Sequence, residues 1–356
     1  LKRKQHKHNC SLGAAVGQAG FARQLGRRAN WYGAVAGLLP DLDVLARPLG
    51  GEWQALVWHR GMTHSLWFGP VVGTALGFGV WRYYERKRRC LENPSPPSAE
   101  SNPLGAWIGL FVLGLLTHPL LDVFTTFGTQ LLAPFSDARF SLHGVGIIDP
   151  LYTGLLFIAL IIGWKSRKKP KRAMASAAVA LALSTGYLFY GMAQNDLAKA
   201  AAREQLTRQL ITIDQLHAYP TVLQPWLRRI VAWSGDEVRI GYISTLRPKP
   251  IVWSSVKNHR GNPRVKALIQ SPNGQLYQWF SNDQLVARLP EADNPIIRLY
   301  DFRYGLIGHE AKSIWGMEGR VDPKTLEVSD THRFRLRNAD MGGMFRQMWS
   351  ILLGKE

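Results

Sequence analysis

Long apolar runs alternate with short polar or basic segments through the first half of the chain. Four of these runs approach the ~20 apolar residues that a membrane-crossing helix needs. They are Ser65–Trp81, Leu104–Leu121, Ile147–Trp164 and Ala173–Ala193. A weaker run, Trp31–Ala46, comes earlier, and the Gly/Ala-rich Leu12–Ala22 is short enough for a re-entrant arm. The pattern predicts about four to six membrane helices within residues 1–194.

The pattern changes after residue 194. Asn195–Leu210 has helical composition, and the rest of the chain consists of short β-rich runs separated by Gly, Pro, Asn and Asp. Lys266–Ser271 and Gln275–Ser281 are two of these runs. Such spacing predicts a small antiparallel sheet or barrel. The predicted fold class is therefore mostly α: a polytopic helical membrane domain (1–194), then a β-rich domain (195–356) that serves as an accessory or lid.

The net charge of +19 comes from 44 Lys and Arg against 25 Asp and Glu. Two strongly basic segments, Arg82–Cys90 and Lys165–Arg172, are short and border apolar runs. The positive-inside rule places both in the cytoplasm, and the C-terminal domain then lies outside it. We therefore attribute the charge to topology and contact with membrane lipids rather than to nucleic acid. The Pro-rich Asn93–Pro103 is expected to be a loop.

Four pairs of ionisable residues interrupt or border the apolar runs, and the predicted topology puts all of them on the outer side. Ionisable groups at membrane depth are costly and suggest function. The pairs are Asp41 with Asp43, His59 with His64, His118 with Asp122, and His143 with Asp149. His118 and Asp122 are four residues apart, so they share one helical face and could chelate a metal. A His–Asp hydrogen bond at a helix end explains that spacing equally well.

Structural alternatives exist for the remaining pairs. Asp41 and Asp43 could both reach one cation, one of them could orient a ligating histidine, or they could cap a turn. His59 and His64 do not share a helical face, although the glycine between them lets a loop bend both inward. Asp149 precedes a proline, so it could cap the following helix instead.

Histidine and carboxylate ligands without cysteine suit zinc, manganese or iron. The two cysteines, Cys10 and Cys90, have no metal-site or disulfide spacing. A mixed His/Asp site with open positions can polarise a phosphoryl or carbonyl oxygen. The residues alone therefore favour a divalent metal, most simply zinc.

Several segments resemble a bacterial inner-membrane family of predicted metal-dependent hydrolases, the YdjM-like family. They read LGAAVG, GAVAGLLPDLDVL, HRGMTHSL, GLLTHPLLDVFTTFGTQLLAPFSDARF and GIIDPLYT, and they cover about Leu12–Tyr152. The family includes LexA-regulated, damage-inducible members and is distantly similar to zinc-dependent phospholipase C. The resemblance implies one metal site. Its residues would be Asp41, Asp43, His59, His64, His118 and Asp122, with Asp149 as a further candidate.

The chain departs from that family at its start. Family members usually carry a Thr-His or Thr-Gln element just before the LGA segment. Asn9 stands at that position here, with His8 as a weaker substitute.

The leading hypothesis is a membrane-bound metal-dependent hydrolase of the bacterial inner membrane. Its substrate would be a phosphoester, such as a lipid or lipid-linked headgroup, at the outer face. Asp41 or Asp122 would act as base, and Arg60 or Arg139 would hold phosphate oxygens. The alternatives are a non-enzymatic scaffold or stress-response protein with a structural metal site, and an ion-coupled transporter. The sequence makes no prediction of oligomeric state.

Overall fold

The computed structural model describes residues 2–90, 103–166, 168–289, 294–305, 307–308, 312–336 and 341–355. Its contacts divide the chain into two units. Unit 1 comprises Leu1–Leu49, Val57–Leu142 and Ile147–Tyr190; unit 2 comprises Gly50–Leu56, His143–Gly146 and Gly191–Glu356. The sequence-based boundary at residues 194/195 stays a prediction, and the expected Pro-rich loop falls almost wholly outside the described residues.

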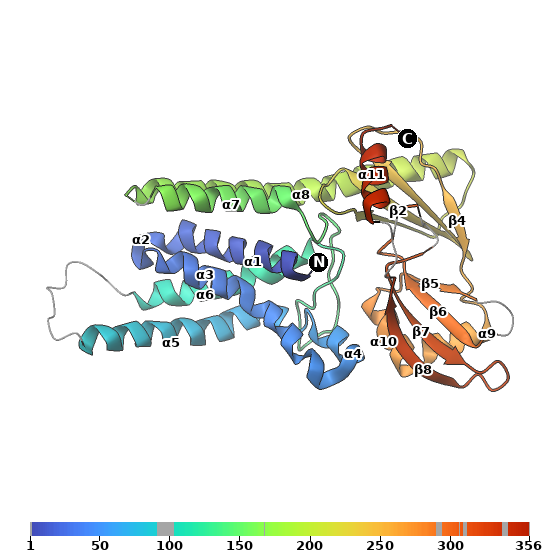
Figure 1. The fold of residues 1–356 in the computed structure, drawn as a ribbon, viewed down its shortest axis with the longest axis horizontal. Coiled ribbons are helices and arrows are strands. Elements are labelled where there is room, and N and C mark those ends of the chain that lie inside the picture. Colours follow the sequence, from blue (N-terminus) through green and yellow to red (C-terminus); the bar gives the residue numbers. More distant parts are fainter. Residues whose placement is uncertain are drawn as a thin grey trace. The chain divides into compact units, whose positions relative to one another are not determined.

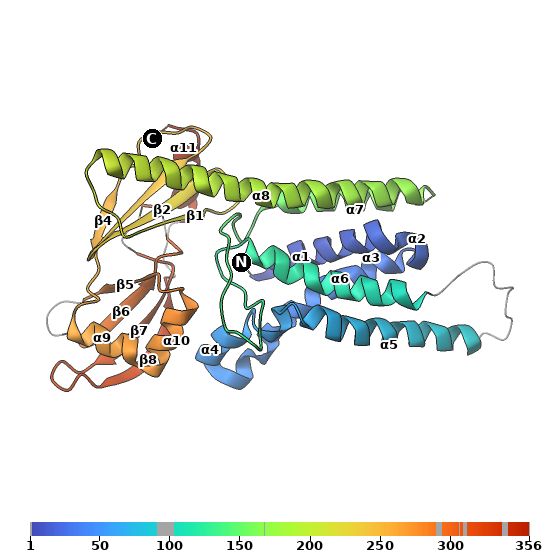
Figure 2. The same ribbon diagram turned by 180° about the vertical axis from the view of Figure 1, so that it is seen from behind.

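Helices build unit 1, and the last of them continues into unit 2 (Figures 1 and 2). They are α1 Lys2–Val16, α2 Ala22–Leu25, α3 Arg28–Leu38, α4 Arg47–Trp58, α5 Phe68–Cys90, α6 Leu104–Val123, α7 Pro150–Lys165 and α8 Pro170–Arg208. A π-helical segment, Gly17–Phe21, joins α1 to α2. Two 3₁₀ segments, Leu39–Ala46 and Met62–His64, lie beside α3 and α5 and carry polar site residues.

Glycines allow the helices of unit 1 to touch backbone to backbone. A Cβ on Gly33 of α3 would lie 2.2 Å from the carbonyl oxygen of Gly13 on α1, and one on Gly73 of α5 would lie 2.8 Å from Val112 of α6. Small residues at helix crossings are typical of packing in membranes, where close approach replaces the hydrophobic driving force. The contact between α1 and α3 fixes two of the helices that reach the polar cluster.

The prediction of four to six membrane helices is wrong. Within the described residues, two helices are long and apolar enough to cross a membrane, α6 and α8. α7 is apolar but shorter. α5 offers only about 14 apolar residues before Arg82–Cys90 continues the same helix, which is short of a span. The run Trp31–Ala46 breaks where α3 gives way to the 3₁₀ segment that starts at Leu39.

Two four-stranded antiparallel sheets form the centre of unit 2, with orders β1-β2-β3-β4 and β5-β6-β7-β8. The strands are β1 Gln215–Pro220, β2 Leu227–Ser234, β3 Glu237–Ser244, β4 Ser254–Lys257, β5 Leu285–Arg288, β6 Ile296–Asp301, β7 Trp315–Val321 and β8 Val328–Arg335. A shared apolar core joins Val231 and Ile240 of the first sheet to Val286 of the second and to Phe302, which directly follows β6. The sheets lie in the part of the chain for which the sequence predicted short antiparallel strands.

Three helices complete unit 2: α9 Pro263–Gln270, α10 Pro272–Phe280 and α11 Met341–Leu352. The first two replace the strands predicted at Lys266–Ser271 and Gln275–Ser281. Each starts with a proline that follows a capping residue: the Asn262 side chain accepts from the Arg264 amide, and the Ser271 hydroxyl accepts from the Gly274 amide. Proline at the first helical position after such a cap is a helix-start signal, and it outweighed the apolar content of these runs.

Candidate metal centre

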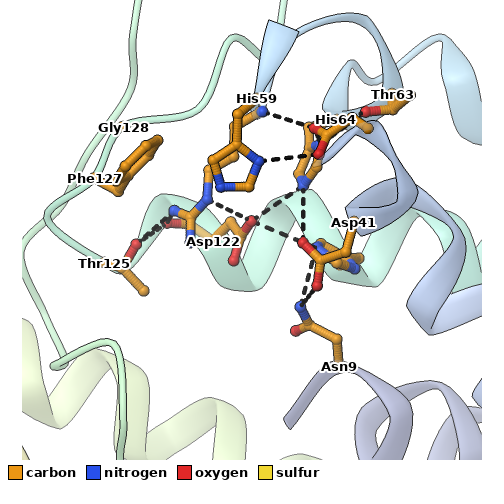
Figure 3. A network of polar contacts seen from close by, with 12 residues as sticks. Asn9, Asp41, His59, Thr63, His64, Asp122, Thr125, Phe127 and Gly128 are labelled. Atoms are coloured by element: carbon orange, nitrogen blue, oxygen red, sulfur yellow. Dashed lines mark hydrogen bonds and ion pairs between the residues drawn. The ribbon is translucent and has the colours of Figure 1, made fainter. Parts of the chain in front are cut away.

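Three buried side chains from separate elements of unit 1 converge on one point (Figure 3). Asp41 comes from the first 3₁₀ segment, His64 from the second, and His118 from α6. One ligand atom from each lies within 4.8 Å of the other two. All three residues are at most 2% exposed. Asp122, one helical turn after His118, joins the same cluster.

The distances in this cluster suit a shared cation better than direct hydrogen bonds. His118 Nε2 lies 3.4 Å from Asp41 Oδ1 and 3.5 Å from Asp122 Oδ2. His64 Nε2 lies 3.4 Å from Asp122 Oδ2 and 3.8 Å from Asp41 Oδ1. Protein hydrogen bonds of this type are usually ~2.7–3.2 Å long. Ligands on bonds of ~2.0–2.2 Å around a tetrahedral zinc lie about 3.3–3.6 Å apart, and three of the four distances fall in that range.

Both histidines turn the same ring nitrogen toward the cluster. His118 Nδ1 donates to the carbonyl oxygen of Gly37 at 2.6 Å, which leaves the Nε2 lone pair directed inward. His64 Nδ1 lies 3.0 Å from the Thr63 hydroxyl, and that hydroxyl donates to Asp43 Oδ2 at 3.3 Å. Because the hydroxyl proton is used on Asp43, Thr63 accepts the proton of His64 Nδ1. Both Nε2 atoms are thus set up as acceptors or ligands.

Asp43 supports the cluster from outside it. Its carboxylate accepts from His59 Nδ1 at 3.0 Å, from the Arg60 amide at 3.0 Å and from Thr63. Burial acts to raise the pKa of Asp43, but the hydrogen bond from His59 outweighs it and the pKa lies below its ordinary value. The structure thus places Asp43 as an orienting group for His64, one of the alternatives left open by the sequence.

His59 points its Nδ1 at Asp43 rather than at Asp41, His64 and His118, called the triad below. Its ring packs edge-on against Phe127. Burial lowers the pKa of His59, so the ring is a neutral donor. Its side chain is still 23% exposed, whereas those of His64 and His118 are fully buried. Solvent therefore reaches the His59 side chain, beside the cluster.

Two arginines flank Phe127 next to the cluster. Arg60 is fully buried; its Nε lies 3.0 Å from Asp122 Oδ2, and its Nη1 donates to the Thr125 hydroxyl at 2.8 Å. Arg139 donates through Nη2 to the carbonyl oxygens of Phe127 and Gly128. Both guanidinium carbons lie within 5.3 Å of the Phe127 ring centre. Arg60 thus contacts a member of the cluster directly, and Arg139 shapes the loop beside it.

Asn9 of α1 is the residue that spacing did not indicate. Its Nδ2 lies 3.2 Å from Asp41 Oδ2 and 3.0 Å from His118 Nε2, and the residue is 1% exposed. The signal in the sequence was its position just before the LGA segment. His8 faces elsewhere, because its Nδ1 contacts the Thr153 hydroxyl.

The last predicted pair, His143 with Asp149, is not part of the group that could hold a metal. Asp149 caps α7, since its Oδ1 accepts from the amides of Leu151 and Tyr152, while its Oδ2 accepts from the Tyr187 hydroxyl at 2.7 Å. His143 belongs to unit 2, where its ring packs edge-on against Tyr219. These contacts match the capping alternative for Asp149, and His143 packs against an aromatic ring of its own unit.

The charge of Asp41 is set by its contacts within the cluster. Burial acts to raise the pKa of Asp41, but contacts with His118 and His64 outweigh it and hold the pKa well below its ordinary value. Asp41 is therefore ionised. An anionic carboxylate with two histidine Nε2 lone pairs, and Asp122 beside them, is a donor set that fits a divalent metal. The identity of that metal is not fixed by the donors.

Comparison with known proteins places these residues in a family. The sequence model described as YdjM inner membrane protein matches residues 6–196. The chain belongs to the YdjM inner membrane protein family. A relative, Inner membrane protein YbcI of Escherichia coli (strain K12), is 34% identical over 115 residues, which is 32% of this chain and 57% of that protein. The chain thus spans little more than half the length of that relative, and no solved structure matches it significantly.

The YdjM match confirms the resemblance drawn from the sequence and identifies an inner membrane protein. The matched range contains every member of the polar cluster, from Asn9 to Asp122, and both helices that could cross the membrane begin within it. Nearly all of the two-sheet region lies beyond the range. The family name assigns no chemistry, so the activity rests on the site itself.

Proposed function

We propose that this YdjM-family protein is a membrane-bound metal-dependent hydrolase whose centre is formed by Asp41, His64 and His118, with Asp122 as a fourth donor. The observation that carries the proposal is His64 Nε2, a buried atom without a hydrogen-bond partner among the described residues. Leaving such an atom unsatisfied costs about 1–3 kcal/mol. A cation shared with Asp41 and Asp122 removes that cost. Zinc suits the donors best, followed by manganese and iron.

The side chains around the centre have separable tasks. When bound, the metal supplies Lewis-acid activation of a phosphoryl oxygen and of water. Asp41 and Asp122 are the carboxylates placed to accept a proton there. Arg60 holds Asp122, and its Nη2 has no hydrogen-bond partner among the described residues, so it offers a donor to a phosphate oxygen. Substrate would approach beside His59, the exposed member of the cluster.

Exposed apolar side chains next to the centre support a lipid or lipid-linked phosphoester as substrate. Trp67 and Phe135 are 54% and 78% exposed, and their rings pack edge-on at 5.8 Å. The loop of Phe135 is tied to the loop of His64, because the Leu66 amide donates to Leu131 and the Gln130 amide to Arg60. An apolar rim beside a phosphate-binding centre suits a substrate with an acyl chain and a phosphorylated headgroup.

The basic segments also support an orientation for this site. If Arg82–Cys90 and Lys165–Arg172 lie in the cytoplasm, α8 runs outward and unit 2 is extracytoplasmic. The hydrolytic centre would then act at the outer face of the inner membrane.

A structural metal site is the second candidate. The nearly complete burial of Asp41, His64 and His118 favours it, because structural zinc sites are closed while catalytic ones keep an open position. The protein would then be a membrane scaffold stabilised by its metal.

Substitution of Arg60 distinguishes a hydrolase from a structural metal site. The full chain, purified in detergent and loaded with zinc or manganese, is assayed for headgroup release from phosphatidylglycerol. The hydrolase proposal predicts metal-dependent release that Arg60→Lys lowers about 10²–10³-fold while metal content is retained. Arg23→Gln, an exposed change on α2, is the control and leaves release unchanged. Metal-loaded protein without turnover above the metal-free control would leave the structural site as the function.

A further inference from the structure

The C-terminal helix α11 has two unlike faces. Met348 and Leu352 are buried in a core that includes Leu227 of β2 and Ile307. Arg346 and Trp349 are exposed three residues apart on another side of α11, and Leu353, which directly follows the helix, is exposed as well. Trp349 and Leu353 are 44% and 49% exposed. The helix and the residue after it therefore present a tryptophan and a leucine to their surroundings, although the inner face of the helix is already packed.

The loop after β3 extends this face. Leu246 is 49% exposed, and Arg247 and Lys249 are exposed beside it. The loop is fixed to the end of α11, because the Ser244 hydroxyl donates to the carbonyl oxygen of Leu352 at 2.9 Å. A Cβ on Gly354 would lie 3.2 Å from Arg247 Cβ. The combined patch, called the anchor surface below, consists of Leu246, Arg247, Lys249, Arg346, Trp349, Leu353 and Lys355.

The anchor surface lies beside the point where the apolar part of α8 ends. Ala193 is the last residue of the apolar run, and the next residue, Gln194, accepts a hydrogen bond from the Thr245 hydroxyl. Thr245 directly precedes Leu246. All of these contacts lie within unit 2, where α11 packs against β2 and β3 (Figure 1). If α8 crosses the membrane, the anchor surface is at the level of the lipid headgroups.

We propose that the anchor surface docks unit 2 onto the membrane that α8 crosses, and that its partner there is anionic phospholipid. Tryptophan is enriched at the membrane–water interface, and Lys and Arg are attracted to anionic lipid. The loop Leu246–Lys249 and residues 341–355 contain four cations and no Asp or Glu. The proposal is independent of any activity at the metal centre.

Depth-dependent quenching tests this docking on the full chain. Leu353→Cys is labelled with an environment-sensitive dye in a Cys10→Ser, Cys90→Ser background and reconstituted into nanodiscs that contain phosphatidylglycerol and doxyl-labelled lipid. Leu210→Cys is the matched control. Leu210 is 93% exposed and lies just past the C-terminal end of α8. By helical rise it is roughly 20 Å beyond Gln194.

We expect the lipid quencher to reduce the signal at position 353 and to leave the signal at position 210 unaffected. Adding Arg247→Gln or Arg346→Gln should lower the docked-to-undocked ratio about fivefold for each cation removed. Equal, weak quenching at the two positions would overturn the proposal. So would a dye at position 353 that is shielded from water without lipid quenching and cross-links to a second copy, because the surface would then be a contact between chains.

Discussion

Replacing Gly33 with alanine tests whether the contact between α1 and α3 holds the metal centre together. A Cβ at this position would lie 2.2 Å from the carbonyl oxygen of Gly13, where ordinary contact needs ~3.4 Å or more. The two backbones must therefore separate by about 1 Å. Neither neighbour can yield by rotating a side chain, since the clash is with backbone.

Separating α1 from α3 displaces residues of both helices that contact the metal centre. Asn9 lies one turn before Gly13 on α1, and its amide donates to Asp41 Oδ2 at 3.2 Å. Gly37 lies one turn after Gly33 on α3 and accepts from His118 Nδ1 at 2.6 Å. A shift of about 1 Å breaks hydrogen bonds of these lengths. We expect Gly33→Ala to lower the free energy of unfolding by about 1–3 kcal/mol and to weaken metal affinity about 10–100-fold.

Chelator competition and thermal unfolding in detergent measure the two effects. Gly154→Ala on α7 is the control, because a Cβ there meets no atom within 4 Å. Alanine in an open helical position should be neutral or stabilise by up to about 1 kcal/mol. If Gly33→Ala binds metal and unfolds like Gly154→Ala, the backbone contact does not position His118.

Three further substitutions separate the tasks of buried carboxylates. Asp43→Asn should lower metal affinity about 10–100-fold without removing a ligand, because His64 loses its orienting charge; chelator competition measures this, and unchanged affinity would rule out that task. Asp149→Ala should cost about 0.5–2 kcal/mol through loss of the α7 cap and leave metal content unchanged; metal analysis that shows a loss would instead make Asp149 a ligand. Asp301→Ala should cost about 3–5 kcal/mol, because buried Arg303 loses its bidentate carboxylate; denaturant unfolding of the full chain would contradict this if the variant matches wild type.

Sequence spacing indicated much of the candidate site. The i,i+4 pair of His118 and Asp122 and the polar residues after Pro40 pointed to the residues that the structure brings together. It could not separate ligands from supporting groups. Asp41 and Asp43 are two residues apart in the same segment, and only their partners distinguish them: His118 and His64 for one, His59 and Thr63 for the other.

The contact of Asn9 and the number of membrane helices could not be predicted from the sequence, because both depend on tertiary structure. Asn9 meets His118 across 109 residues, through a helix crossing that no local pattern predicts. The number of membrane helices was overestimated because an apolar run does not report where its helix ends. Ser65–Trp81 lies mostly within α5, which continues into Arg82–Cys90, and Trp31–Ala46 changes from α to 3₁₀ geometry. Helix boundaries depend on tertiary contacts as well as on composition.

The metal content of the purified full chain tests the central claim most directly. Elemental analysis of protein in detergent, after exposure to zinc or manganese and removal of free ion, should give near one divalent ion per chain. His64→Ala and His118→Ala should each lose that ion, while His332→Ala, an exposed histidine of β8, should retain it. Wild-type protein without bound metal, or triad variants that keep it, would contradict the assignment of Asp41, His64 and His118 as a metal centre.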